Sequence, residues 1–157
     1  MKLYLVQHGE AVPESVDPNR PLTDQGREDI VRLASFLQES GVEVARVINS
    51  GKIRARTSAD ILATAIAPGV TIEDRETGLL PKDSTEDMAD ATSVFTEATL
   101  IVGHQPFMSR FVSRLVLGQE SPLLVDFVPG TTVCLVRRAV TGAWFMGWMV
   151  TPDLLRR

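Results

Sequence analysis

The amino-acid sequence predicts an α/β fold in which most strands of a central sheet run parallel and an antiparallel hairpin lies at the edge. Short β-rich runs alternate with segments whose apolar residues recur at helical spacing, and this alternation is typical of β-α-β units. Two of the predicted strands are followed at once by a turn that contains a histidine and a glycine. Near the C-terminus, two β-rich segments joined by a short turn predict the hairpin.

The N-terminal half is predicted to contain three strands and two helices. The predicted strands cover residues 3–6, 45–49 and 70–72. The predicted helices extend from the N-cap Thr23 to Gly41, and from Ser50 to Pro68 and Gly69. Their apolar faces consist of Ile30, Leu33, Ala34 and Leu37 in the first helix, and of Ala55, Ala59, Leu62 and Ile66 in the second.

The C-terminal half begins with a polar stretch, residues 73–92, which is predicted as a loop with a short helix inside it. A buried strand is expected over 99–102, and Pro106 is expected to be the first residue of the following helix. The apolar side of that helix consists of Phe107, Phe111 and Leu115. Segments 132–136 and 143–148 form the predicted hairpin, joined through Thr141 and Gly142.

Composition restricts the class of protein and its partners. A chain of 157 residues, 44% hydrophobic and 23% charged, is expected to fold as one globular domain over residues 1–157. A net charge of -4 disfavours general binding to nucleic acid. The single cysteine, Cys134, excludes an internal disulfide, and no apolar run is long enough for a secretory leader or a membrane span. We therefore expect a cytoplasmic protein that binds neither nucleic acid nor membranes.

His8 and His104 are the only histidines, and each follows a predicted strand. The carboxyl ends of parallel strands meet at one edge of a sheet, so we expect the two side chains to converge there. Neutral imidazoles can attack phosphorus or carbon, exchange protons or bind a metal. Neither histidine has a partner at zinc-site spacing, so no metal is expected.

Other nucleophiles have weaker support. No glycine-serine-glycine elbow accompanies the histidines, which disfavours a serine hydrolase. Cys134 lies among Val133, Leu135 and Val136 in a predicted strand, so we assign it to the core. Either histidine could therefore act as the nucleophile, or could merely be buried without a chemical role.

Positive charge near the second strand points to phosphate. Lys52, Arg54 and Arg56 fall in the first turns of the predicted helix, where free backbone N–H groups and the dipole favour an anion. Cations at this end oppose the dipole, so a functional reason for them is expected, although such residues are often only a solvated face. Arg54 is the strongest candidate of the three.

Four separated motifs, in order along the chain, carry a resemblance to a known family. They are His8-Gly9 after the first strand, Arg20-Pro21-Leu22-Thr23 with Gly26, Ser50 through Arg54-Ala55, and Gly103-His104-Gln105-Pro106. Together they resemble the histidine phosphatase superfamily, which includes the phosphoglycerate mutases. The short chain is most similar to its small branch, the SixA-type phosphohistidine phosphatases, and the resemblance extends from Met1 to about Trp148.

The resemblance implies a three-layer α/β/α fold of the phosphoglycerate mutase type, as a single domain without a cap domain and without a cofactor. It implies that His8 is the nucleophile and becomes transiently phosphorylated. His104 and Arg54 would complete the catalytic set, with His104 contacting the phosphoryl group and Arg54 holding its oxygens. The candidate phosphate-binding residues are Gln7, Gly9, Arg20, Lys52 and Arg54.

Two positions depart from the family pattern. The family has arginine before the nucleophilic histidine, whereas Gln7 offers a neutral amide. The missing donor should lower the rate unless Arg20, Lys52 or Arg56 replaces it. The family commonly takes its general acid from the loop after the third strand, where this chain has Gly78. Glu76 and Asp83 are the substitutes that the loop offers.

Three functions therefore stay open. The first is a phosphatase acting on phosphohistidine in a protein, such as a histidine phosphotransfer domain. The second uses the same chemistry on a small phosphoester. The third is a degenerate member that binds phosphate or a phosphoprotein with little turnover, an interpretation that Gln7 and Gly78 favour and the presence of both histidines disfavours.

Overall fold

The computed structural model describes residues 1–157 and contains one six-stranded sheet. The strands are β1 (Lys2–Gln7), β2 (Arg46–Asn49), β3 (Ile72–Asp74), β4 (Thr99–Gly103), β5 (Thr132–Arg137) and β6 (Trp144–Val150). Their order in the sheet is β3-β2-β4-β1-β5-β6, in which β3, β2, β4 and β1 run parallel. β5 pairs antiparallel with β1 and with β6, so the predicted hairpin lies at one edge.

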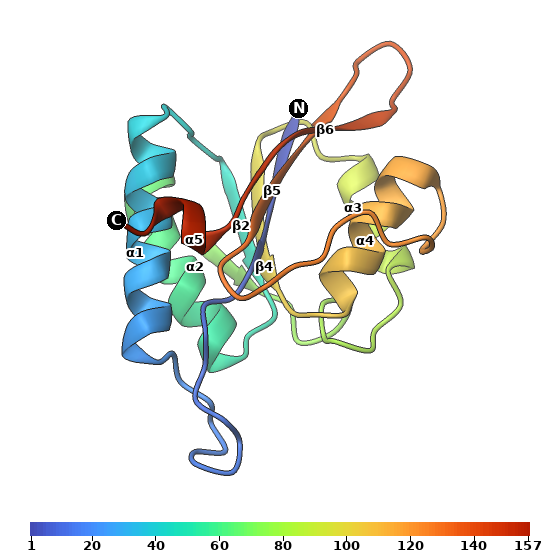
Figure 1. The fold of residues 1–157 in the computed structure, drawn as a ribbon. Coiled ribbons are helices and arrows are strands. Elements are labelled where there is room, and N and C mark those ends of the chain that lie inside the picture. Colours follow the sequence, from blue (N-terminus) through green and yellow to red (C-terminus); the bar gives the residue numbers. More distant parts are fainter.

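Five helices cover the two faces of the sheet. They are α1 (Asp24–Glu39), α2 (Ile53–Ile66), α3 (Glu86–Ser93), α4 (Phe107–Leu117) and α5 (Pro152–Leu155). Figure 1 shows α1, α2 and α5 on one side of the sheet and α3 and α4 on the other. The predicted three-layer α/β/α architecture is therefore confirmed.

Each face of the sheet has its own apolar core. Alternating residues of β1 supply both cores, because successive side chains of a strand point to opposite faces. Tyr4 and Val6 pack with α1 and α2, whereas Leu3 and Leu5 pack with α3 and α4. The apolar stripes expected on α1 and α2 are buried in the first core, as is Cys134. These two cores hold the carboxyl ends of β1, β2 and β4 in fixed positions.

Several element boundaries differ from the sequence prediction. The third strand starts at Ile72 rather than at residue 70, because only 72–74 find a hydrogen-bonded partner on β2. The second helix begins at Ile53, three residues after Ser50, and the fourth begins one residue after Pro106. The short helix expected within the polar stretch is α3. Thr23 is the N-cap of α1, as predicted, and accepts a hydrogen bond of 2.9 Å from the Gly26 N–H.

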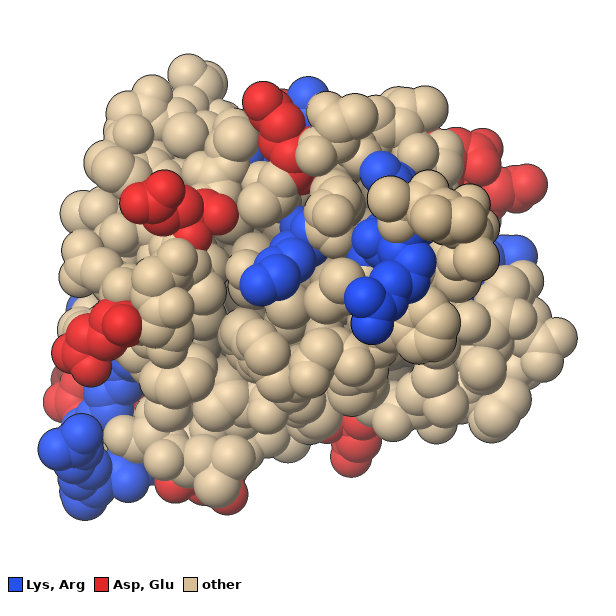
Figure 2. All heavy atoms as spheres, turned by 90° about the horizontal axis from the view of Figure 1, so that it is seen from above, with Lys and Arg blue, Asp and Glu red and all other residues tan.

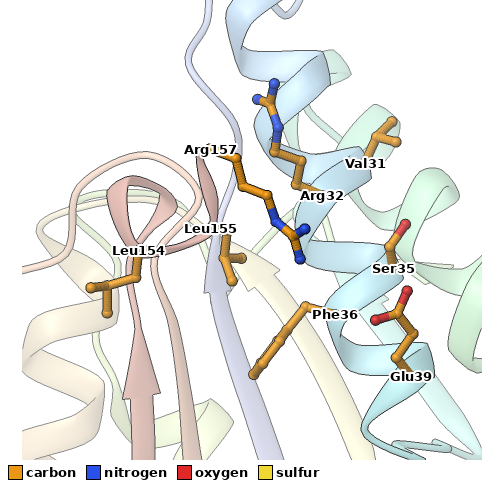
Figure 3. A pocket seen from close by; sticks show the side chains of 8 residues that line it. All are labelled: Val31, Arg32, Ser35, Phe36, Glu39, Leu154, Leu155 and Arg157. Atoms are coloured by element: carbon orange, nitrogen blue, oxygen red, sulfur yellow. The ribbon is translucent and has the colours of Figure 1, made fainter.

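The helix α5 was not predicted, because four residues carry no periodic signal. It packs against α1, where Arg156 pairs with the buried carboxylate of Asp29 at 2.6 Å. Figure 3 shows the pocket of about 360 Å³ that lies between α1 and this C-terminal segment, with Phe36 on one side and Leu155 on the other. With this contact, α5 completes the helical layer that α1 and α2 form on one side of the sheet.

Charged side chains at the N-terminal end of β1 carry both signs. Figure 2 views the molecule from above Figure 1, toward the end where the N-terminus lies. Basic side chains form small groups near the centre of this face and at its lower left margin, and acidic ones lie mostly around the margin. None of the five helices is both long and apolar enough to cross a membrane.

Candidate active site

His8 lies directly after β1 and is held by its own backbone turn. The register of β1 and β4 pairs Gln7 with Gly103, and the His8 N–H donates to the Gly103 carbonyl at 3.1 Å. The ring atom Nδ1 lies 2.7 Å from the Gly9 carbonyl oxygen. Because a carbonyl can only accept, Nδ1 carries the proton and Nε2 has the free lone pair. The turn therefore determines the tautomer of His8.

Gly9 is required by close packing against α1. A Cβ at this position would lie 2.8 Å from the Gly26 carbonyl oxygen and 2.9 Å from a side-chain carbon of Ile30. The Gly9 N–H donates to Ser58 Oγ at 3.0 Å, and Gly9 does not line the cavity that contains the histidines. The Gly9 N–H is therefore already engaged by the protein, and a role of Gly9 in binding phosphate stays a prediction. Gly9 lets the histidine turn approach α1.

His104 lies directly after β4, beside His8. The two ring centroids are 5.0 Å apart with planes tilted by 58°. His104 Nε2 shares a hydrogen bond of 2.6 Å with the hydroxyl of Ser50, which follows the neighbouring strand β2. Both side chains are buried, and His104 Nδ1 has no protein partner. His104 therefore has one ring nitrogen bonded to protein and one buried without a hydrogen-bond partner.

Arg54 is brought to the site by the first turn of α2. Asn49 shapes the turn between β2 and α2: its side chain accepts from the Gly51 N–H at 2.7 Å and donates to Asp74 at 2.8 Å. Ser58, one turn farther along α2, donates to the Arg54 carbonyl at 2.8 Å and accepts the Gly9 N–H. A single hydroxyl thus connects the helix of the arginine to the turn of the histidine.

Arg20 reaches the site from the loop between β1 and α1. Its φ of 47° lies in the left-handed region, which costs a non-glycine residue on the order of 1 to 3 kcal/mol. The loop is held closed by a bridge between Ala11 and Leu22, and Arg20 Nε donates to the Val12 carbonyl at 3.1 Å. Such strain persists where the surrounding structure demands it, and here it directs a guanidinium group toward the histidines.

A cavity of about 240 Å³ brings most of the predicted residues together. The side chains around it that bear on chemistry are Gln7, His8, Glu10, Arg20, Arg54 and His104. Lys52 does not line this cavity but lies in a second one beside it, which Arg20 and Arg54 also line. Arg56 lies away from both cavities and is paired with Asp74 at 2.7 Å and Asp60 at 3.2 Å.

The structure shows what Gln7 does in place of the family arginine. Its side chain is buried, and the amide orientation that satisfies both of its polar groups directs the nitrogen to the carbonyl groups of Phe127 and Val128 at 3.2 and 3.3 Å. Its backbone also bonds to the same segment, with the Gly130 N–H donating to the Gln7 carbonyl at 3.0 Å. The amide is therefore engaged in holding the segment before β5 against β1, which leaves its N–H groups unavailable as phosphate donors.

Neither of the predicted general acids lines the histidine cavity. Asp83 accepts from the backbone N–H groups of Gly78 and Leu80 at 2.7 and 2.9 Å, so it shapes its own loop. Glu76 is exposed, and its side chain lies near Gly51. The carboxylate that does line the cavity is Glu10, which accepts from the Thr23 hydroxyl at 2.8 Å.

The sequence analysis missed three residues of this site. Glu10 stands two positions after His8, and this adjacency was the signal that could have identified it. Ser50 was expected to begin a helix and a family motif, with no contact to His104, and no role was expected for Ser58. Both serines act through contacts to residues 54 and 49 positions away in the chain, respectively, and sequence spacing gives no sign of such contacts.

Burial and positive charge keep both imidazoles neutral. Burial lowers the pKa of His8 from 6.5 to about 4; the Gly9 hydrogen bond opposes this shift, and the charges of Arg54 and Arg20 add to it. Burial also lowers the pKa of His104, to about 3, with His8 and Arg54 as the next causes. Burial and the charge of Arg20 lower the pKa of Arg54. The arginines are thus close enough to repel each other, and an anion between them would relieve that repulsion.

No group of three or more His, Cys, Asp or Glu side chains is placed to hold a metal ion. The chemistry that the site can perform with its own residues is attack by a neutral imidazole next to two guanidinium groups. Such groups suit the equatorial oxygens of a phosphoryl group.

Comparisons with known proteins agree with this geometry. The sequence model of the histidine phosphatase superfamily, branch 1, matches residues 3–77. An uncharacterized protein of Picosynechococcus sp. is 31% identical over 127 residues, covering 76% of this chain and 75% of that protein. The phosphohistidine phosphatase SixA of Escherichia coli is 22% identical over 165 residues, covering 99% and 97% of the two chains.

Among solved structures, the protein histidine phosphatase SixA complexed with tungstate superimposes with a TM-score of 0.87 at 21% identity. The superposition covers 99% of this chain and 100% of that one, so the fold is shared over its whole length. The family model and the relatives in sequence show that this chain belongs to the histidine phosphatase superfamily.

Proposed function

We propose that the protein removes a phosphoryl group from phosphohistidine in a protein, through a phosphohistidine intermediate on His8. The observation that carries this proposal is the hydrogen bond from His8 Nδ1 to the Gly9 carbonyl, which leaves Nε2 free to attack. The low pKa of His8 keeps that nitrogen unprotonated at pH 7. An imidazole in this state is a nucleophile that needs no separate base.

In the first step, His8 Nε2 attacks phosphorus and the bond from phosphorus to the substrate imidazole nitrogen breaks. Charge on the three equatorial oxygens is stabilised by Arg20 and Arg54, which line the same cavity. His104 contacts the phosphoryl group through Nδ1, the ring nitrogen that has no protein partner. The leaving imidazole takes a proton and departs.

In the second step, water attacks phosphorus and the bond to His8 Nε2 breaks, which releases inorganic phosphate. Glu10 is the carboxylate at the cavity and is held by the Thr23 hydroxyl. We assign it the task of giving a proton to the leaving group in the first step and taking one from water in the second. Glu10 replaces Glu76 and Asp83 in this role.

The substrate class follows from the chemistry of the leaving group. A phosphoramidate bond is labile, and imidazole leaves with less proton donation than an alkoxide requires. This suits a site whose acid-supplying loop has glycine at position 78. The similar SixA protein of E. coli is named a phosphohistidine phosphatase, and the similar solved structure holds tungstate, an oxyanion. These likenesses support phosphohistidine over a small phosphoester.

One observation favours a second candidate function, binding of phosphate or a phosphoprotein with little turnover. The Gln7 amide is engaged by the segment before β5, so the position that holds an arginine in the family supplies no charge here. Loss of one donor of this kind costs about a hundredfold to a thousandfold in rate. A test must therefore separate turnover from binding.

The experiment is a phosphotransfer assay with a histidine phosphotransfer domain that carries labelled phosphohistidine. Wild type, His8→Ala and Glu10→Gln are compared for phosphate release and for acid-labile label on the enzyme. We expect release and label in wild type, neither in His8→Ala, and slower release in Glu10→Gln. Release at the wild-type rate by His8→Ala would exclude the covalent mechanism. Stoichiometric binding by wild type without release or label would favour the second candidate.

A further inference from the structure

A second cavity, of about 390 Å³, lies next to the histidine cavity. It is formed where the loop between β1 and α1 meets the turn between β2 and α2, and six of its lining residues are Glu14, Asn19, Arg20, Gly51, Lys52 and Arg54. Arg20 and Arg54 also line the histidine cavity, so a ligand held by these arginines would be in reach of both.

The cations of this second cavity form no salt bridge within the protein, and the only nearby carboxylate whose charge acts on Arg54 is that of Glu14. Arg20, Lys52 and Arg54 form no ion pair, as is true of most Lys and Arg side chains of this chain, but these three gather on one cavity. Arg54 Nε is also buried without a hydrogen-bond partner. Glu14 is the one carboxylate of the lining and is exposed. In an acidic chain, unpaired positive charge gathered on one cavity indicates an anionic ligand.

The charge exceeds what one phosphoryl group at His8 requires. Arg20 and Arg54 already face the histidine cavity, where His104 adds a further nitrogen. Lys52 lines the second cavity only, and from there its charge also helps to lower the pKa of His104. It is the residue that distinguishes the two cavities, and its ammonium group has no role in the transfer described above.

We propose that this second cavity binds an anionic group of the substrate that lies next to the transferred phosphoryl group, with Lys52 as its main cation. The inference rests on the proposed function, because it takes the phosphoryl group to be at His8. A carboxylate has the required chemistry. It could belong to an acidic residue beside the phosphohistidine of a protein or to an acid group on a small phosphoester.

Stable phosphonates test the cavity without turnover. Calorimetry would compare phosphonoacetate, 3-phosphonopropionate and 4-phosphonobutyrate with the alkyl phosphonates of equal length, which lack the carboxylate. We expect at least one carboxylate to tighten binding to wild type by about threefold to tenfold, the range for a charge-assisted contact that is partly exposed. Lys52→Gln should remove this gain, so that the carboxylate phosphonates and the alkyl phosphonates of equal length bind the variant equally well.

Lys2→Gln is the matched control, because Lys2 is also exposed and begins β1 at the end opposite to His8. It should keep the carboxylate gain. If alkyl phosphonates bind but no carboxylate improves their binding, or if Lys52→Gln keeps the gain, the second cavity does not have this role. If no phosphonate binds at all, the phosphoryl site and therefore the proposed function fail as well.

Hydrolysis assays distinguish the two sources of the anionic group, an acidic residue of a protein substrate and an acid group on a small phosphoester. Phosphohistidine peptides with flanking aspartate or flanking asparagine would be compared as substrates of wild type and of Lys52→Gln. A preference of wild type for aspartate that Lys52→Gln abolishes identifies an acidic protein substrate. Small phosphoesters with and without a carboxylate would be compared in the same way. If wild type prefers the carboxylate only among these small phosphoesters, the substrate is a small molecule. No preference in either series contradicts the proposal.

Discussion

The two histidine turns stand at equivalent strand ends but are held in different ways. His8 is bonded to the backbone carbonyl of the next residue, whereas His104 is bonded to the hydroxyl of Ser50, which follows the neighbouring strand β2. A carbonyl can only accept, so one tautomer of His8 is enforced by the chain itself. A hydroxyl can donate or accept, so the tautomer of His104 depends on a side chain that evolution can replace. The tautomer of the proposed nucleophile, His8, is thus set locally, and that of His104 is set by a tertiary contact.

The largest difference between the two histidines should appear on their removal. His8→Ala loses the nucleophile, and we expect turnover to fall about ten-thousandfold or more. His104→Ala loses a contact to the phosphoryl group, and we expect a fall of about a hundredfold. Single-turnover assays with labelled phosphohistidine should detect label on His104→Ala and none on His8→Ala. Equal loss of label in both variants would contradict the division of roles.

Both histidines should make the fold sensitive to acid. Each is held neutral in the folded state, with a pKa of about 4 for His8 and about 3 for His104, whereas the unfolded chain takes up protons below about 6.5. The unfolded state then binds more protons, so the free energy of unfolding falls as pH falls. The slope is about 1.4 kcal/mol per pH unit for each histidine.

Urea unfolding at pH 7.5, 6.5, 5.5 and 5 checks this, in buffers that lack phosphate. His8→Gln and His104→Gln should each lower the slope by about half below pH 6.5. A slope in either variant equal to that of wild type would show that the neutral form of that histidine is not favoured by the fold.

Substitution of Gln7 is a way to add positive charge beside His8 without changing the contacts of His104. Gln7→Arg keeps donors for the carbonyls of Phe127 and Val128 and adds charge beside the phosphoryl group. We expect kcat/KM to rise by about tenfold or more. Gln7→Met is the neutral control, of similar length, and should not raise it. No gain in Gln7→Arg would show that Arg20 and Arg54 already supply the charge that the reaction needs.

The smallest expected effect on turnover concerns the hydrogen bond between Ser50 and His104. The Lys52 N–H donates to Ser50 Oγ at 3.4 Å, which leaves the hydroxyl proton free to bond to His104 Nε2 and favours a proton on Nδ1. Ser50→Ala should lower kcat by about fivefold, the value of one hydrogen bond, and Ser50→Thr should restore it. Nitrogen NMR reads the tautomer directly, since only two imidazoles contribute. An unchanged His104 tautomer in Ser50→Ala would contradict this positioning role.

Particular elements show how far the sequence could be interpreted. Thr23 was identifiable as an N-cap because its hydroxyl bonds three residues away, within one turn. The third strand was displaced by two residues and α5 was missed, because both depend on a partner elsewhere in the chain. The single domain without a cap, the absence of a metal and the cytoplasmic location stay predictions.

The sequence by itself determined the α/β class, the placement of His8 and His104 at neighbouring strand ends, and the phosphatase family, because strand and helix periods and short motifs are local properties. Only the tertiary structure decided that Glu10 rather than Glu76 or Asp83 meets the cavity, that the Gln7 amide is bonded to the segment before β5, and that Lys52 belongs to a second cavity. Each of these outcomes depends on which distant segments pack together, and side-chain contacts over such separations arise only when the two cores form.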